Sequence, residues 1–306
     1  MMKILKTSLY CLGFLSLFAC KLDQGNGERK FRITTTTNIL ADGVRALVRD
    51  SAEVTPLMAI GVDPHLYKAS QRDLDLLFEA DLVLFHGLHL EGKMVEVLEK
   101  FGRNNEVIDQ GKMIPDEELI MNPEYSNSVD PHIWFDVSLW KKAMTGIAQE
   151  LITKKPEWKN YVERNLQAYQ TSLDSLDAAT RNEIRDITSM GQVLITAHDA
   201  FSYFGKAYGI EVKGLQGLST LSEPGLRDVS DLVSFIIEKQ IKAIFVEQSI
   251  SPKALEAVVQ GCKRRGHTVR LAGPLYTDSL GDPGGEAGTY VGMVHTNVRT
   301  IVENLK

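Results

Sequence analysis

The chain has 306 residues, of which 43% are hydrophobic and 24% are charged, and its formal net charge at pH 7 is −6. This composition is typical of a globular protein with one large or two medium domains rather than of a disordered chain. Because the net charge is negative, the sequence offers no basic field for nucleic acid, and we expect no nucleic-acid partner.

Residues 1–19 have the pattern of a signal peptide. Lys3 and Lys6 give a positively charged start, and the apolar run 8–19 follows. With about twelve residues, the run is too short for a membrane-spanning helix, which needs about 20, and it suits the apolar region of a signal. We therefore expect an exported protein. Since no other segment is long and apolar enough to span a bilayer, any transport would need a separate membrane partner.

The cysteine that follows the signal indicates a lipid anchor. Ala19-Cys20 resembles the bacterial lipobox, in which the cysteine is acylated and becomes the first mature residue. We predict lipidation of Cys20, a flexible tether over residues 20–30, and a location on the cytoplasmic membrane, facing the periplasm or the cell exterior. Phe18 is bulkier than the usual lipobox residue, and a simple cleaved signal with an incidental cysteine is the alternative.

Alternating strands and helices predict an α/β fold built from parallel βα units. In the first half, strands are expected at 31–37, 54–58, 81–85 and 106–108, and helices at 39–48, 70–80 and 91–101. Asn38 is a candidate N-cap of the first helix, and 112–129 is a polar loop. In the second half, strands are expected at 193–196, 210–212, 243–247 and 269–271, and helices at 199–207, 224–239 and 252–265.

One segment differs from this alternation. Residues 156–187 contain no glycine and no proline after Pro156, which suits the first turn of a helix. At 1.5 Å per residue, such a helix would span roughly 45 Å. We predict a strut between two lobes, since the sustained heptads of a coiled coil are missing. The predicted domains are an N-terminal lobe at 31–155, a connecting helix at 156–189 and a C-terminal lobe at 190–306.

Three of the seven histidines lie where parallel α/β sheets bind ligands. His65 and His198 fall at the carboxyl ends of predicted strands, and His132 ends a loop that also follows a strand. That edge of the sheet is the usual binding edge. His65 and His132 each follow Asp-Pro, and the proline fixes the backbone just before the imidazole. Because no Cys-x-x-Cys pair is present, a thiolate zinc site is not expected.

Five stretches together resemble a known family. They are Thr-Thr-Thr-Asn-Ile-Leu-Ala-Asp (35–42), Gly-Val-Asp-Pro-His (61–65), Asp-Pro-His-Ile-Trp (130–134), Thr-Ala-His-Asp-Ala-Phe (196–201) and Tyr-Thr-Asp-Ser-Leu (276–280). In this order they are similar to the cluster A-I (cluster 9) metal-binding receptors of ABC importers, the TroA/ZnuA-like family. The resemblance covers nearly all of residues 31–306 and is greatest to TroA-type members.

The resemblance implies two lobes of parallel βα units, joined by one long helix, with a divalent metal ion buried at their interface. It assigns His65 and His132 of the first lobe and His198 and Asp278 of the second as ligands. Nothing in the residues alone would single out Asp278. The implied function is that of a receptor, not an enzyme, which delivers the ion to an ABC permease and its ATPase. We expect a monomer.

The ligand types favour zinc. Three imidazoles and one carboxylate suit Zn(II), which lies far above Mn(II) in intrinsic affinity for such sites. Manganese-dedicated members of the family usually carry Glu where this chain has His198, which favours zinc. Zinc-dedicated members often carry a His-rich loop, but the corresponding loop here, 112–129, contains no His, which weakens the case for a zinc specialist. We predict Zn(II), with Mn(II) as the close alternative. Asp63, Asp130 and Asp199 are candidates to hold the imidazoles, and Asp199 also suits a helix cap.

Other histidines and other function classes are weaker candidates. Four histidines are expected to be structural: His86, His89, His267 and His295. The alternatives from other classes are an exported zinc hydrolase that uses only the three histidine ligands, and a surface adhesin lipoprotein. The chain lacks an HExxH motif, and a catalytic zinc usually keeps an open position that a fourth protein ligand would fill. Nothing in the sequence marks an adhesive surface.

Overall fold

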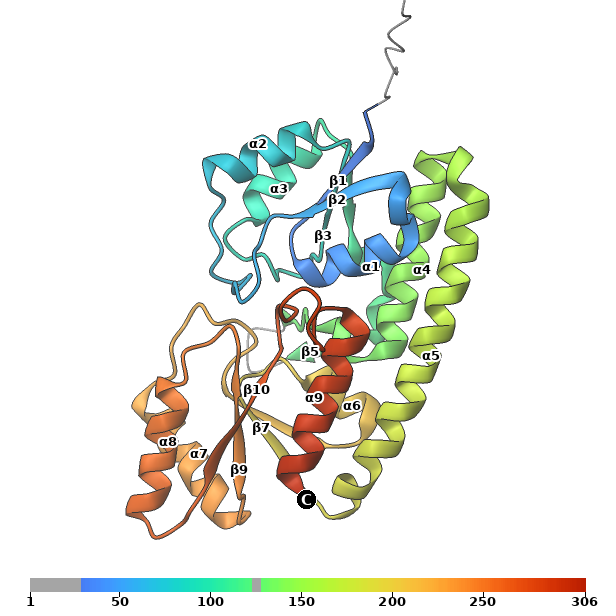
Figure 1. Ribbon diagram of the computed structural model, residues 1–306. Helices are drawn as coiled ribbons and strands as arrows, with labels where there is room; N and C mark the ends of the chain where they lie inside the picture. The colour runs from blue at the N-terminus through green and yellow to red at the C-terminus, as the bar shows by residue number, and fades with distance from the viewer. Residues whose placement is uncertain (1–28, 123–127) are drawn as a thin grey trace, which may run out of the picture.

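The computed structural model describes residues 29–122 and 128–306. The predicted signal peptide, Cys20 and nearly all of the predicted tether lie outside these ranges. Within them, no helix has both the length and the apolar character that crossing a bilayer requires. The described chain forms two lobes, one above the other in Figure 1, with long helices along one side.

A four-stranded parallel sheet forms the centre of the N-terminal lobe. In spatial order its strands are β2 (Ala52–Pro56), β1 (Phe31–Thr35), β3 (Leu82–Phe85) and β4 (Val107–Asp109). The connecting helices are α1 (Asn38–Val48), α2 (Gln71–Glu79) and α3 (Val95–Gly102). Ile33 and Leu84 of the two central strands are fully buried in a core shared with α1. Every element predicted for this half is present, and the sheet is parallel because each connection returns the chain to the same edge.

The start of α1 differs from the prediction. Thr37, not Asn38, caps the helix, because the Thr37 Oγ1 accepts a hydrogen bond from the Leu40 N–H at 3.2 Å. Asn38 is instead the first helical residue, and it is buried. Its side-chain amide is therefore free of the capping role and available for contacts outside the helix.

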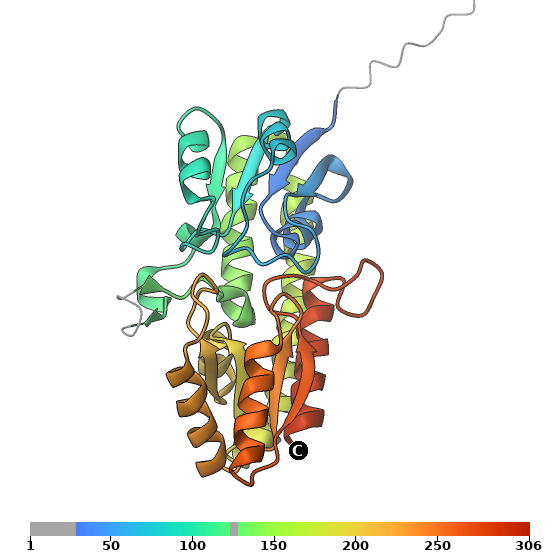
Figure 2. The same cartoon turned by 90° about the vertical axis from the view of Figure 1, so that its left-hand side faces the viewer.

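The segment predicted as a strut is a long helix that passes both lobes (Figures 1 and 2). This helix, α5 (Lys159–Ser189), has 31 residues, which at 1.5 Å per residue is roughly 45 Å. It begins after Pro156 because Pro156–Trp158 forms a separate 3-10 turn. Its neighbours are α4 (Val137–Lys154), α1 of the first lobe and α9 (Tyr290–Leu305) of the second. One helix thus packs against both lobes, which confirms the predicted connecting helix.

The C-terminal lobe repeats the parallel βα arrangement. β7 (Val193–His198) pairs with β8 (Glu211–Gln216), β9 (Ala243–Glu247) pairs with β10 (Arg270–Leu275), and β7 lies beside β9. The other helices are α6 (Ser202–Tyr208), α7 (Leu226–Glu238) and α8 (Lys253–Arg264). The sequence analysis singles out no helix after 265, although the buried residues of α9 recur at helical spacing. The fold class is α/β, as predicted.

The polar stretch 112–129 is not a plain loop. It includes an antiparallel pair, β5 (Met121–Asn122) and β6 (Ser128–Val129). At its base the Ile120 N–H donates to the Tyr203 hydroxyl of α6, and that hydroxyl donates to the Asp130 carbonyl, both at 3.0 Å. The segment that leads to His132 is therefore fastened to the second lobe before it enters α4.

Candidate metal centre

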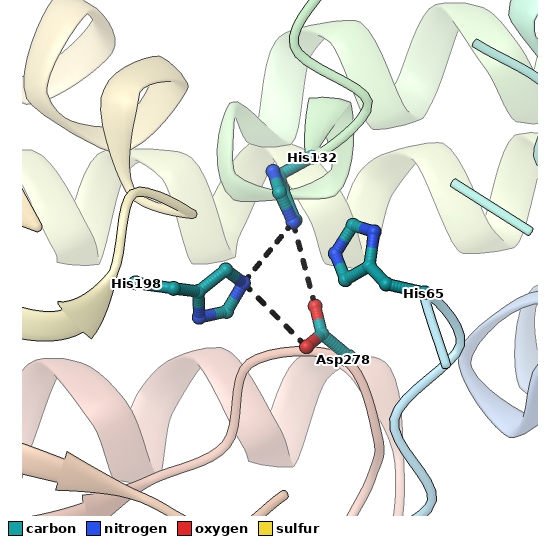
Figure 3. A group of neighbouring side chains, drawn as sticks. All are labelled: His65, His132, His198 and Asp278. Atoms are coloured by element: carbon teal, nitrogen blue, oxygen red, sulfur yellow. Dashed lines mark hydrogen bonds and ion pairs between the residues drawn. The ribbon is translucent and has the colours of Figure 1, made fainter. Parts of the chain in front are cut away.

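The four predicted ligands converge at the interface of the lobes (Figure 3). His65 lies in the loop after β2, and His132 lies between β6 and α4. His198 is the last residue of β7, and Asp278 lies in the loop between β10 and α9. Each side chain thus comes from a different loop or strand end, and the two lobes supply two each. All four are buried, with at most 2% of any residue exposed.

The spacing of the four side chains suits a single ion. One potential ligand atom of each lies within 4.8 Å of all the others, and no other such group of three or more occurs in the described ranges. The His132 and His198 Nε2 atoms are 3.3 Å apart, and the Asp278 oxygens lie 3.5 Å and 3.6 Å from them. With metal–nitrogen bonds near 2.0–2.1 Å, a tetrahedral site has ligand–ligand edges of about 3.3 Å.

His132 is oriented by Asp130, as the sequence analysis expected. The Asp130 Oδ1 lies 2.8 Å from the His132 Nδ1 and accepts the His132 backbone N–H at 2.9 Å. Both side chains are fully buried. Because Nδ1 donates to a carboxylate, the lone pair is on Nε2, which faces the centre (Figure 3). The Asp-Pro-His turn therefore supplies both a candidate ligand and the group that fixes its ring.

Glu247 plays the corresponding part for His198, and the sequence analysis missed it. Its two carboxylate oxygens bind the His198 backbone N–H at 2.9 Å and the His198 Nδ1 at 2.6 Å. Asp199, the residue considered for this role, instead accepts from the Ser202 hydroxyl at the start of α6. It does not cap that helix, because the N-cap of α6 is Phe201 and no side chain makes a capping bond there. The available signal was an acid that ends the apolar strand 243–247, because such a strand end points to the binding edge.

The two remaining ligands have unpartnered polar atoms that face the centre. The His65 Nε2 and both Asp278 carboxylate oxygens are buried without a hydrogen-bond partner among the described residues. Buried polar atoms are almost always hydrogen-bonded, and each exception calls for an explanation. These three atoms have free lone pairs and lie around one point, which is the arrangement that a cation requires. Asp63 binds the His65 backbone N–H at 2.8 Å and so holds the loop rather than the ring.

Burial and neighbouring charges set the protonation of the centre. Burial, together with repulsion between the imidazoles, holds the pKa values of His65 and His132 well below their usual range, so both rings are neutral. Burial also lowers the pKa of His198, but the carboxylates of Glu247 and Asp278 outweigh it and raise the pKa to about 10. Burial raises the pKa of Asp278 to about 7. A proton on the His198 Nε2 can then bridge to the His132 Nε2.

The four histidines predicted to be structural stay outside the centre. His86 is buried against Trp134, with ring centroids 4.9 Å apart, and its Nε2 contacts the Thr37 hydroxyl at 2.7 Å. Burial lowers the pKa of His86 to about 3. The His267 Nε2 donates to the Ile241 carbonyl. His89 and His295 are exposed.

Comparisons with known proteins identify the relatives of this chain. The model of the ZnuA family, described as zinc-uptake complex component A periplasmic, matches residues 33–304. The manganese-binding lipoprotein MntA of Bacillus subtilis is 45% identical over 293 residues, covering 95% of each chain. The zinc-binding protein TroA of Treponema pallidum is 41% identical over 293 residues, covering 96% of this chain and 94% of TroA.

A more distant relative and a solved structure extend the likeness. The manganese ABC transporter substrate-binding lipoprotein PsaA of Streptococcus mitis is 27% identical over 305 residues, which are 96% of each chain. The solved structure of TroA from Treponema pallidum superposes with a TM-score of 0.88 at 42% identity and covers 90% of this chain and 99% of that one. Since the family model spans nearly the whole described chain, this protein belongs to the ZnuA family.

Proposed function

We propose that the protein is an extracytoplasmic receptor that captures one divalent transition-metal ion between its lobes and delivers it to an ABC import permease and its ATPase. The observation that carries the proposal is the convergence of His65 and His132 from one lobe with His198 and Asp278 from the other. An ion bound by both lobes would favour their closed arrangement, because it binds only when the two halves of the site are together.

Binding, rather than catalysis, is what this ligand set supports. A catalytic zinc usually has three protein ligands and an open position for water. Here a fourth ligand, Asp278, is within 3.6 Å of two of the imidazoles and is buried with them. The family is one of solute-binding receptors, as the names of its members indicate. We therefore propose a receptor that is not an enzyme.

We propose Zn(II) as the ion, with Mn(II) as the close alternative. Three nitrogen ligands favour Zn(II) in intrinsic affinity, while the carboxylate of Asp278 is acceptable to both ions. The names of the relatives divide in the same way, since TroA is named for zinc and MntA for manganese. We expect both ions to bind, with the tighter binding for Zn(II).

The cellular setting is proposed from the sequence and from the relatives named as lipoproteins. Residues 1–19 are proposed to be removed on export, Cys20 to carry the lipid anchor, and residues 20–30 to act as a tether. The receptor would then lie on the cytoplasmic membrane, facing the periplasm or cell exterior, as a monomer. Its lobes are proposed to be 31–155 and 190–306, with 156–189 between them.

The metal content of the purified protein tests the proposal. A soluble chain that begins at Lys21 is purified without chelators or metal-affinity resin and is analysed for its elements by mass spectrometry. We expect about one equivalent of Zn(II) or Mn(II) per chain, which the four ligands can hold. The ion should be lost in Asp278→Ala but retained in His295→Ala, which alters an exposed histidine of α9. A wild-type protein that stays empty when both ions are offered would refute the proposal.

A further inference from the structure

The loop that carries Asp278 is anchored at both ends, once in each lobe. On one side, Asn297 of α9 binds Tyr276: its Oδ1 accepts from the Tyr276 N–H at 2.9 Å, and its Nδ2 donates to the Tyr276 carbonyl at 2.7 Å. On the other side, Ser279 and Leu280 bind the N-terminal lobe. Asp278 therefore lies between an anchor in its own lobe and an anchor in the opposite one.

The anchor in the opposite lobe is the amide of Asn38 at the start of α1. Its Oδ1 accepts from the Leu280 N–H at 2.8 Å, and its Nδ2 donates to the Ser279 hydroxyl at 2.9 Å. Asn38 is 8% exposed and Ser279 is 2% exposed. Because the contact is buried, water does not readily replace these bonds, and breaking them leaves polar groups unpaired.

The Ser279 hydroxyl also binds the loop that leads to His65. It accepts from the Gly61 N–H at 2.8 Å and donates to the Leu280 carbonyl at 3.1 Å, besides accepting from Asn38. A serine hydroxyl has one donor and two acceptor positions, and all of them are used here. One side chain thus ties the Asp278 loop to the first lobe at two points, and it has no capacity left to bind an ion.

The loop that carries His65 shows the converse arrangement. Asp63 accepts the His65 backbone N–H through Oδ1 and the Thr220 hydroxyl through Oδ2. Thr220 follows β8 in the C-terminal lobe and is buried. The loop that carries His65 and the loop that carries Asp278 are therefore each held in place by a residue of the other lobe.

We propose that Asn38 and Ser279 are positioning residues that keep Asp278 on the bound ion and so set the rate at which the ion leaves. The inference rests on the proposed function, because it presumes a bound ion. The backbone at Asp278 can move away from the imidazoles only as far as Ser279, the next residue, leaves the first lobe. That step breaks the bonds from Asn38 and Gly61 to the loop, and a partner that separates the lobes here would free the carboxylate first.

The rate of ion release tests the proposal. The chain from Lys21 is loaded with one equivalent of Zn(II), mixed with an excess of a strong chelator, and followed by stopped-flow absorbance. Asn38→Ala and Ser279→Ala are each expected to release Zn(II) roughly tenfold faster, since each leaves buried polar groups unpaired. The double variant should be little faster than either single variant, because both changes break the same contact. Loading should remain at one ion per chain.

A matched control separates this role from a general loss of stability. Asn165 is also 8% exposed, and its Nδ2 donates to the Leu47 carbonyl at 2.8 Å, away from the Asp278 loop. Asn165→Ala should lower the thermal unfolding midpoint as Asn38→Ala does, yet leave release unchanged. Equal acceleration in the control, or no acceleration in Asn38→Ala, would overturn the proposal. A wild-type chain that holds neither Zn(II) nor Mn(II) would instead overturn the proposed function.

Discussion

The four candidate ligands form two pairs that the protein holds in different ways. In the first pair, His132 and His198 each direct Nδ1 at a buried carboxylate of the same lobe, at 2.8 Å and 2.6 Å. In the second pair, the His65 Nε2 and the Asp278 oxygens have no hydrogen-bond partner among the described residues. The loops of the second pair are instead fastened to the opposite lobe.

This difference separates what each lobe prepares alone from what the packed lobes prepare together. Each carboxylate orients its ring through a contact that does not cross the interface, although the Asp130 carbonyl is also bound by the Tyr203 hydroxyl of the second lobe. A loop held from across the interface is in place only while the interface is intact. The first pair should therefore govern how tightly an ion binds, and the second how readily it is lost when the lobes separate.

The largest expected effect is the loss of a ligand of the first pair. His132→Ala removes one of four ligands and leaves a cavity in the centre, so Zn(II) affinity should fall by more than about 100-fold, beyond the loss expected for an outer partner. Competition with a chromophoric chelator measures it. His295→Ala is the control, and an unchanged affinity in His132→Ala would remove His132 from the site.

The second largest expected effect is the loss of the Glu247 carboxylate, which binds the Nδ1 atom of His198. Glu247→Gln keeps the shape of the side chain but removes the charge that holds the His198 ring and supports its basicity. Zn(II) affinity should fall by about 10–100-fold, the usual range for such partners. The same titration as for His132→Ala measures it. Asp199→Asn, which alters the residue beside His198 that binds Ser202 instead, should have a much smaller effect.

The protonation of the centre predicts how binding depends on pH. In the metal-free protein the pKa of His198 is raised to about 10, because the Glu247 and Asp278 carboxylates outweigh the opposing effect of burial. An ion must displace that proton, so apparent affinity should rise with pH by about tenfold per unit for each proton released. Calorimetry in two buffers of different ionisation enthalpy should detect about one proton above pH 7.

The pKa of Asp278 sharpens the same prediction. Burial raises the pKa of Asp278 to about 7, so this carboxyl is protonated in the metal-free protein below that pH. Binding of the ion below pH 7 should therefore release a second proton. Glu247→Gln should lower the pKa of His198 and flatten the dependence. Binding that releases no proton at all would show that the metal-free centre carries no such charge.

The smallest expected effect lies on the His65 side of the second pair. Thr220→Val keeps the volume but removes the hydroxyl that binds Asp63 across the interface. Loss of one hydrogen bond to a carboxylate should weaken Zn(II) binding by roughly tenfold or less. Thr180→Val is the matched control, because the Thr180 hydroxyl is buried without a partner. If both variants bind alike, the contact between Thr220 and Asp63 does not support the centre.

Part of this organisation follows from local patterns in the sequence. The alternation of strands and helices predicted parallel βα units, and the glycine-free stretch after Pro156 predicted the long helix that is now α5. His65, His132 and His198 were found because each follows a strand or an Asp-Pro turn. Such signals involve residues close together in the chain, which is why they can be detected without a structure.

Other residues could be recognised only through the packing of the lobes. Asp278 has no local feature that distinguishes it from other acids, and it was assigned by family resemblance alone. Glu247 becomes a partner of His198 only because β9 lies beside β7. Asn38 suggested a helix cap, but Thr37 caps the helix.

The sequence by itself therefore determined the kinds of elements in this protein, the long helix between the lobes and three of the four candidate ligands. The tertiary structure alone decided which carboxylate stands behind His198 and which residue holds the Asp278 loop. The reason is the distance along the chain: Asn38 and Ser279 are 241 positions apart and meet only at the interface. No local pattern can encode a contact whose two halves belong to different lobes.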